Sequence, residues 1–279
     1  MINFIYKSLG LYLNTLTRIS PERGGKAGFN LFCTPQRTKI KRKQLDFLKT
    51  ASQSDFDFNG RKIRTYQWGN GPVKVLFVHG WQSFTFRWKK YIEALLDKNF
   101  TLVGFDAPGH GLSEGKRFTV PQNAYLIQQL VNHYNGFDAV VTHSIGSFSF
   151  FYAMAKFQLP SIGKLIAMAS PGSASEFISF YTKTLKLKPD TVWNIKNEFQ
   201  QYVKEEIEKI SLVHMVKNLS LPGLIIHDRE DPRTNYTNAL SLQEHWDNSQ
   251  LLTTDGLGHN LRSPDVVNAV RDFILAKNI

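Results

Sequence analysis

Short apolar runs alternate with longer amphipathic stretches along most of this chain. A short apolar run between turn residues is typical of a buried strand, and apolar residues three or four positions apart are typical of a helix. The strand-like runs are residues 73–78, 102–105, 139–142, 165–169, 224–226 and 251–252. The helical patterns are residues 88–96, 123–133, 145–157, 236–245 and 265–275, the last preceded by Ser263 as N-cap and opened by Pro264. This alternation predicts an α/β fold with a mainly parallel sheet and helices on both faces.

A hairpin precedes the first of these runs. Residues 56–58 and 63–66 alternate between apolar and polar side chains, and Asn59-Gly60 lies between them. Asn-Gly is a strong signal for a two-residue turn, because both central residues of such a turn need positive φ. We therefore expect an N-terminal antiparallel hairpin at the edge of the parallel sheet.

Two segments fall outside the alternation. Residues 1–50 begin with apolar residues at helical spacing up to Leu16, ending before Ser20-Pro21, and form a basic N-terminal helical extension. Residues 51–279 form the main domain, interrupted at about 172–220 by a stretch without strand-like runs. That stretch predicts a short helix around Phe180 and a long amphipathic helix containing Phe199 and Ile210. We interpret it as a helical cap over the active site, and a longer crossover connection is the alternative.

Composition narrows the class of protein. The 42% of hydrophobic and 20% of charged residues exclude global disorder. A single cysteine, Cys33, cannot form an internal disulfide and suits a reducing compartment. No apolar run is long enough to span a bilayer, and polar residues interrupt the N-terminal apolar stretch that a signal peptide would need. These features predict a cytoplasmic protein.

The positive charge is concentrated at one end. Residues 1–50 carry ten Lys and Arg against two acidic residues, out of a net charge of +11 for the whole chain. We interpret the charged side chains of this segment as a solvated surface and its helix as packed on the main domain. We expect no nucleic-acid partner. The alternative is peripheral membrane contact, because a basic amphipathic helix suits an anionic lipid surface.

The strongest chemical signal follows the third parallel run. Residues 140–147 read VVTHSIGS, so a β-branched strand leads directly into Ser144 and then into a helical pattern. A serine on such a tight strand-to-helix turn projects its hydroxyl from the end of the sheet. Gly146 provides the small residue that the close backbone needs two positions later, whereas Thr142 stands where glycine is usual. Alone, this pattern also fits a serine that merely caps a helix.

Partners for this serine follow later strands. A serine hydroxyl needs an adjacent base, and the base needs an orienting carboxylate. His259 lies on a glycine-containing loop just after residues 251–252, and Asp228, Glu230 and Asp231 follow residues 224–226. The order serine, acid, histidine is the one used by α/β hydrolases.

From about residue 53 onward the chain resembles the α/β-hydrolase superfamily, in particular its lid-bearing serine esterases. Four blocks carry the resemblance: VHGW at residues 78–81, DAPGHGLS at 106–113, the Ser144 turn, and the pair Asp231 and His259. The resemblance implies Ser144 as nucleophile, His259 as general base and Asp231 as orienting acid, with Glu230 as the alternative acid. It also implies an oxyanion hole made by the backbone N–H groups of Trp81 and Ile145.

The resemblance further implies cleavage of a carboxylic ester or thioester, or of a related C–C bond. No metal or cofactor is expected, because the remaining histidines have no metal-ligand spacing with Cys, Asp or Glu. Aromatic residues near the motifs, among them Trp81 and Phe148, suggest a small-molecule acyl substrate that is apolar. His110 is expected to be structural, and His143 to face away from the serine hydroxyl. A non-catalytic binding protein with the same fold is the second hypothesis.

Overall fold

The computed structural model describes residues 2–97, 99–217 and 219–276. The chain divides into two compact units. The sheet unit comprises Pro35–Gly172 and Met215–Ile279, and the helical unit comprises Met1–Thr34 and Ser173–His214.

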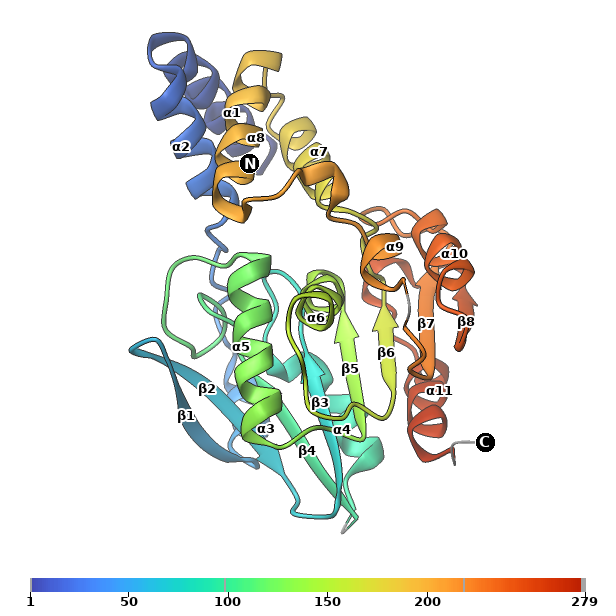
Figure 1. The fold of residues 1–279 in the computed structure, drawn as a ribbon. Helices are drawn as coiled ribbons and strands as arrows, with labels where there is room; N and C mark the ends of the chain where they lie inside the picture. The colour runs from blue at the N-terminus through green and yellow to red at the C-terminus, as the bar shows by residue number, and fades with distance from the viewer. Residues whose placement is uncertain (1, 98, 218, 277–279) are drawn as a thin grey trace. The chain divides into compact units, whose positions relative to one another are not determined.

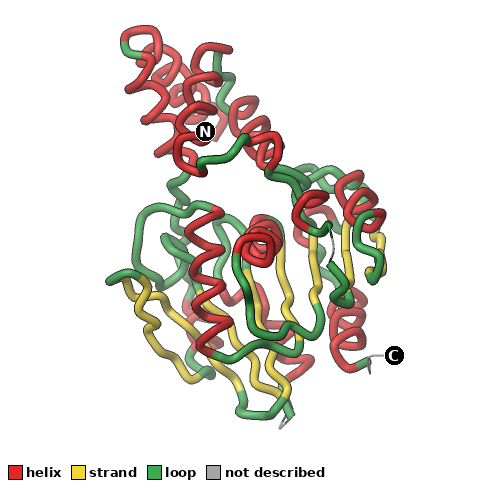
Figure 2. Tube along the Cα trace, viewed as in Figure 1, coloured by secondary structure: helices red, strands yellow, loops and turns green. Residues whose placement is uncertain are grey.

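An eight-stranded sheet forms the centre of the sheet unit, in the order β1-β2-β4-β3-β5-β6-β7-β8 (Figures 1 and 2). The strands are β1 Ser52–Phe58, β2 Arg61–Trp68, β3 Val73–Val78, β4 Phe100–Phe105, β5 Ala139–His143, β6 Leu165–Met168, β7 Gly223–Asp228 and β8 Ser249–Thr254. Strands β3 to β8 are parallel to one another, whereas β2 pairs antiparallel with both β1 and β4. The predicted mainly parallel sheet with an antiparallel start is confirmed.

The predicted hairpin joins β1 to β2. Phe58 pairs with Arg61, and the two residues between them, Asn59 and Gly60, have φ of 54° and 74°. Two consecutive positive φ angles match the right-handed twist of the paired strands, so this turn closes the hairpin without splaying it.

Helices cover both faces of the sheet. They are α3 Arg42–Leu48, the 3-10 turn η1 Thr85–Trp88, α4 Lys89–Leu95, α5 Val120–His133, α6 Ile145–Lys156, α10 Thr237–Glu244, the 3-10 turn η3 Gly258–Asn260 and α11 Pro264–Leu275. Helix α5 packs beside α6, and α4 packs beside α11 (Figure 1). Helix α11 begins as predicted, with Pro264 in its first turn and the Ser263 hydroxyl accepting a hydrogen bond from the Asp265 N–H.

A buried carboxylate joins three segments at the end of β4. Asp106 is fully buried and accepts hydrogen bonds from the backbone N–H and the hydroxyl of Thr85, both at 2.8 Å. It also accepts from the Tyr66 hydroxyl at 3.0 Å and the Leu112 N–H at 2.9 Å. Burial raises the pKa of Asp106, and these donors oppose that effect. The carboxylate therefore fixes the loop after β4 against β2 and η1.

The helical unit combines segments from two distant parts of the chain. Its elements are α1 Ile2–Ile19, α2 Pro21–Phe32, α7 Ala174–Thr184, α8 Pro189–Val203, the 3-10 turn η2 Ile207–Lys209, and most of α9 Leu212–Met215. Helix α2 packs against α1 and α8. Phe29 and Phe32 meet Phe199 edge to face, with ring centroids 4.7 and 4.8 Å apart. Helix α1 thus docks on the insertion, where the sequence patterns suggested docking on the main domain.

Two helical predictions differ from the structure in this unit. The helix expected to contain both Phe199 and Ile210 ends at Val203, because Lys204 adopts the left-handed conformation with φ of 57°. Ile207 and Ile210 are still buried, so the apolar spacing continues across a 3-10 turn. Helix α2 was not predicted, since three glycines in its twelve residues disfavour a helix by intrinsic propensity.

Within the described ranges, no helix is both long and apolar enough to cross a membrane. The predicted boundary at residue 50 and the role of residues 172–220 as a cap stay predictions.

We expect Asp106→Ala to lower the free energy of unfolding by about 3–5 kcal/mol, because it leaves several buried donors without an acceptor. Urea denaturation followed by circular dichroism measures this. Asp247→Ala, at an exposed acidic residue, is the control and should change stability by less than about 0.5 kcal/mol. Equal stability of the two variants would contradict the role given to Asp106.

Candidate active site

Ser144 lies on the turn between β5 and α6, with φ of 55° and ψ of −129°. A non-glycine residue with positive φ is strained, and such strain persists only where the surroundings enforce it. The Ser144 N–H donates to the Met168 carbonyl at 2.9 Å, which ties the turn to β6. Its carbonyl accepts from the Ser147 and Phe148 N–H groups, so α6 begins immediately.

The residues on either side of the turn show why it tolerates this sequence. A Cβ atom on Gly146 would lie 2.5 Å from the His79 carbonyl oxygen and 2.7 Å from that of Val78, so only glycine fits there. Thr142 replaces the usual glycine without a clash. Its Oγ1 lies 2.8 Å from both Ser147 Oγ and the Ile166 carbonyl oxygen, so its hydroxyl is buried with partners.

Three side chains from separate loops form a continuous hydrogen-bonded series. His259 Nε2 lies 2.9 Å from Ser144 Oγ, and His259 Nδ1 lies 2.8 Å from Asp231 Oδ2. The Asp231 side chain is fully buried and that of His259 is 10% exposed. An ionised carboxylate only accepts hydrogen bonds, so Nδ1 carries the proton and Nε2 is left to accept from the Ser144 hydroxyl.

Asp231 is held as a charged group. Burial alone would raise its pKa, but hydrogen bonds from His259 and Thr234 outweigh burial and lower the pKa to about 2. Its Oδ2 accepts from the Thr234 hydroxyl at 2.7 Å, and its Oδ1 accepts from the Arg233 and Thr234 N–H groups at 2.8 and 3.1 Å. Glu230 is exposed, and among the described side chains Asp231 is the carboxylate in contact with His259.

A second buried carboxylate links the acid loop to the histidine loop. Asp228, at the end of β7, accepts from the Thr254 hydroxyl at 2.7 Å and the Leu257 N–H at 2.9 Å. Its other oxygen accepts from the Glu230 N–H at 3.0 Å. These hydrogen bonds lower the pKa of Asp228 although burial opposes them. Asp228 therefore fixes the spacing between the loops that carry Asp231 and His259.

The histidine loop is also held from the opposite side. His143 Nε2 lies 2.8 Å from the His259 carbonyl oxygen, so this nitrogen donates. Arg87 donates to the Asn260 carbonyl at 2.9 Å. Burial, with the Arg87 charge as the next cause, lowers the pKa of His143 well below its usual value, and His143 stays neutral. We expected His143 only to face away from the serine hydroxyl, and no spacing in the chain signals its contact with residue 259.

His227 is a further histidine that sequence reasoning missed. It is buried at the end of β7, and its Nε2 lies 3.5 Å from Asp231 Oδ2 and 3.1 Å from the Thr234 carbonyl oxygen. Only its position four residues before Asp231 hinted at this contact. His227 thus contacts both Asp231 and the backbone of Thr234.

The loop after β3 brings a backbone segment beside Ser144. His79 accepts from the Ala107 N–H at 2.9 Å through Nε2 and therefore donates to the Gly80 carbonyl through Nδ1, at 2.8 Å. Burial lowers the pKa of His79 to about 4, which keeps this arrangement neutral. A Cβ atom on Gly80 would lie 3.0 Å from the Ser144 Cβ. The Gly80–Trp81 peptide thus lies close to the serine.

His110 has a structural position, as the resemblance implied. Its Nδ1 lies 3.0 Å from the Pro108 carbonyl oxygen and its Nε2 accepts from the Gln82 N–H at 3.1 Å. Burial lowers its pKa to about 3. It stacks edge to face with Trp81, at a ring-centroid distance of 5.6 Å, and so supports that side chain.

Most of the aromatic residues near the sequence motifs belong to the hydrophobic core. Phe148, Phe150 and Phe151 on α6 are buried, as is Phe84. Trp81 is half-buried and packs edge to face on Phe118, with centroids 5.6 Å apart.

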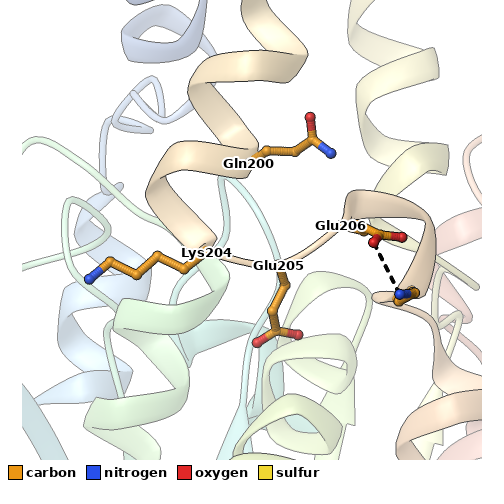
Figure 3. A pocket seen from close by; sticks show the side chains of 5 residues that line it. Gln200, Lys204, Glu205 and Glu206 are labelled. Carbon is orange, nitrogen blue, oxygen red and sulfur yellow. Dashed lines mark hydrogen bonds and ion pairs between the residues drawn. The ribbon is translucent and has the colours of Figure 1, made fainter.

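A pocket of about 470 Å³ lies in the helical unit, away from these aromatic residues in sequence (Figure 3). It is lined by Gln200, Lys204, Glu205, Glu206 and Lys209. Glu206 and Lys209 form an ion pair at 3.1 Å. This charged lining does not suit an apolar acyl group. Among the described residues, no group of three or more His, Cys, Asp or Glu side chains is arranged to hold a metal ion.

The lowered pKa of Asp231 makes a prediction about stability. A carboxyl whose pKa is lower in the folded state stabilises that state above about pH 4, and this contribution is lost as the pH falls toward about 2. Asp231→Asn removes the titration. We therefore expect the stability difference between the wild type and Asp231→Asn to shrink by about 1 kcal/mol between pH 6 and pH 3. Urea denaturation at the two pH values measures it, and a constant difference would contradict the assigned pKa.

Comparison with known proteins agrees with this architecture. A family model described as the alpha/beta hydrolase family matches residues 75–270. An esterase of Pyrococcus furiosus superposes with a TM-score of 0.64 at 17% identity, covering 86% of this chain and 95% of that one. A thioesterase domain from the curacin biosynthetic pathway gives 0.60 at 14% identity, covering 81% and 99%. Est1E from Butyrivibrio proteoclasticus, solved with ferulic acid bound, gives 0.60 at 20% identity, covering 80% and 98%. At these identities, the likeness shows the fold alone.

One curated relative is the dihydrolipoyllysine-residue acetyltransferase component of the acetoin cleaving system from Cupriavidus necator. It is 33% identical over 94 residues, which are 32% of this chain. The matched region spans 25% of that relative's length, so its activity is not transferred. The family model, by contrast, covers well over half of the chain, and the sheet has the strand order and parallel core described above. The chain belongs to the α/β hydrolase family.

Proposed function

We propose that this protein is a serine hydrolase that cleaves a carboxylic ester or thioester through an acyl-enzyme on Ser144. His259 acts as general base and Asp231 as the orienting acid. One observation carries the proposal: Ser144 Oγ, the His259 imidazole and the Asp231 carboxylate are joined by contacts of 2.9 and 2.8 Å. Each of the three lies on a loop that follows a strand of the same sheet. A serine that only caps a helix would need neither His259 nor Asp231.

The backbone beside Ser144 supports an oxyanion hole made by Trp81 and Ile145. Ile145 is the first residue of α6, so its N–H has no acceptor within the helix. The Gly80 carbonyl is held by His79, and a trans peptide directs the following N–H, that of Trp81, to the opposite side. Donors preorganised in this way stabilise negative charge that develops during attack.

The chemistry then follows two half-reactions. The Ser144 hydroxyl attacks the substrate carbonyl while its proton passes to His259 Nε2, and the imidazolium is stabilised by Asp231. Collapse of the tetrahedral intermediate breaks the bond to the leaving oxygen or sulfur, which takes the proton from His259. Water, deprotonated by the same nitrogen, attacks the acyl-enzyme and releases the acid and Ser144.

An apolar acyl group is the substrate class that we propose. Trp81 directly follows Gly80, which approaches Ser144 closely, and its half-buried ring packs on Phe118. We take this ring as an aromatic surface for the acyl group. The solved structures that share the fold include an esterase and a thioesterase domain. Both chemistries use the same acyl-enzyme, and the leaving group alone distinguishes them.

Fluorophosphonate labelling tests the nucleophile, followed by a series of p-nitrophenyl esters and the matching acyl thioesters. We expect the wild type to label and to hydrolyse, and Ser144→Ala or His259→Ala to lose at least about 10⁴-fold in kcat. Intact-mass analysis should place the adduct on Ser144. A folded wild type that fails to label would favour the non-catalytic binding protein.

Asp231 and Glu230 form a matched pair for testing the acid. Asp231→Asn keeps the shape of the side chain but removes its charge, so His259 takes the wrong tautomer, and we expect kcat to fall by about 10³–10⁴-fold. Glu230→Gln should change kcat by less than about twofold, because Glu230 is exposed and does not contact His259. A reversed order of the two variants would make Glu230 the acid.

Asp228 is predicted to act by positioning. Asn at this position cannot accept all three hydrogen bonds, so the histidine loop loses a tether, and we expect kcat to fall about tenfold. The pH dependence of kcat should keep its midpoint, since Asp228 does not contact the imidazole. Asp255→Asn is the control: Asp255 is an exposed acid of the same loop, paired with Arg229 at 2.7 Å. A similar loss in both variants would exclude a specific role for Asp228.

A further inference from the structure

Helix α1 has an exposed apolar face. Phe4, Leu11 and Ile19 are 74%, 69% and 78% exposed, and they follow one another at intervals of seven and eight residues, which is close to two helical turns. They therefore lie on one side of the helix. Ile5 and Tyr12 are also exposed and extend this face at one edge. We call these five residues the α1 face.

The other side of α1 is already used for packing within the helical unit. Leu13 and Thr17 are buried, and a Cβ atom on Gly10 would lie 1.8 Å from the Leu185 carbonyl oxygen. Asn14 accepts from the Lys188 N–H at 2.9 Å and donates to the Lys186 carbonyl at 3.3 Å. The helix is thus anchored by its small and buried residues, and the α1 face does not contribute to this packing.

Positive charge borders the α1 face. Helix α1 contains Lys7 and Arg18 but no acidic residue, and both cations are exposed. Lys186 and Lys188, whose backbone is bonded to Asn14, are exposed as well. Exposed apolar side chains flanked by cations are the arrangement by which helices lie in the interface of an anionic membrane.

We propose that the α1 face docks the protein on an anionic lipid bilayer, with the helix parallel to the surface. The apolar residues enter the boundary between headgroups and acyl chains, and Lys7 and Arg18 contact lipid phosphates. A second copy of the chain fits the face less well, because pairing two such faces would bring four cations together without an acid from either α1. This inference does not depend on the proposed hydrolase activity.

Vesicle flotation of the full chain tests the proposal. We expect the wild type to float with mixed phosphatidylcholine–phosphatidylglycerol vesicles and to remain in the dense fraction with phosphatidylcholine alone. The variant Phe4→Ser/Leu11→Ser/Ile19→Ser should bind the anionic vesicles at least about tenfold more weakly. Lys7→Gln/Arg18→Gln should weaken binding by about tenfold or more and reduce its dependence on salt.

A matched control is available in the sheet unit. Leu96, Leu240 and Leu275 are 51%, 45% and 55% exposed, and the triple serine variant at these positions should float like the wild type. Circular dichroism verifies that each variant is folded. Three results would overturn the proposal: a wild type that does not float, equal loss in the two triple variants, or a wild-type dimer that the α1-face variant dissociates without any vesicle binding.

Discussion

The strained, positive-φ backbone of Ser144 is the constraint on which the rest of the site depends. Such a conformation costs about 1–3 kcal/mol for a non-glycine residue, and the surrounding contacts must offset it. They include the Ser144 N–H bond to Met168 on β6, the first turn of α6, and the close approach of Gly146 to the carbonyls of β3. The strain is thus distributed over three neighbouring strands and a helix. Only with that support is the hydroxyl held where His259 can reach it.

Buried carboxylates organise the end of the sheet around this turn, and their surroundings give them different electrostatic states. Asp106 is enclosed so completely that burial dominates and its pKa rises. Asp228 receives enough backbone and hydroxyl donors for its pKa to fall. Asp231 has in addition the His259 imidazole, and its pKa falls to about 2. An aspartate side chain therefore holds loops together at positions 106 and 228, and provides a fixed negative charge at position 231.

Local patterns in the sequence predict the strands, the hairpin turn at Asn59-Gly60 and the start of α11, because each depends on residues next to one another. The placement of Ser144, Asp231 and His259 at strand ends followed from the same patterns and from the family resemblance. Contacts between distant residues had no such signal. The bond from His143 to the His259 carbonyl and the tether from Asp228 to Leu257 depend on how two loops meet. The apolar spacing did not predict the end of α8 at Val203, because Ile207 and Ile210 continue that spacing beyond the helix.

The composition of the helical unit, which combines segments from two distant parts of the chain, constrains the order in which the chain can fold during synthesis. Helices α1 and α2 are synthesised before α8, but an aromatic side chain that both Phe29 and Phe32 pack against, that of Phe199, belongs to α8. Until the ribosome has translated that region, α1 and α2 have only each other to pack against, and short helices with little tertiary packing are marginal in water. The strands up to β6 can meanwhile pair with one another. Residues 21–32 therefore reach their final environment only after α8 has been made, and apolar side chains that await their partners are prone to aggregation in the interval.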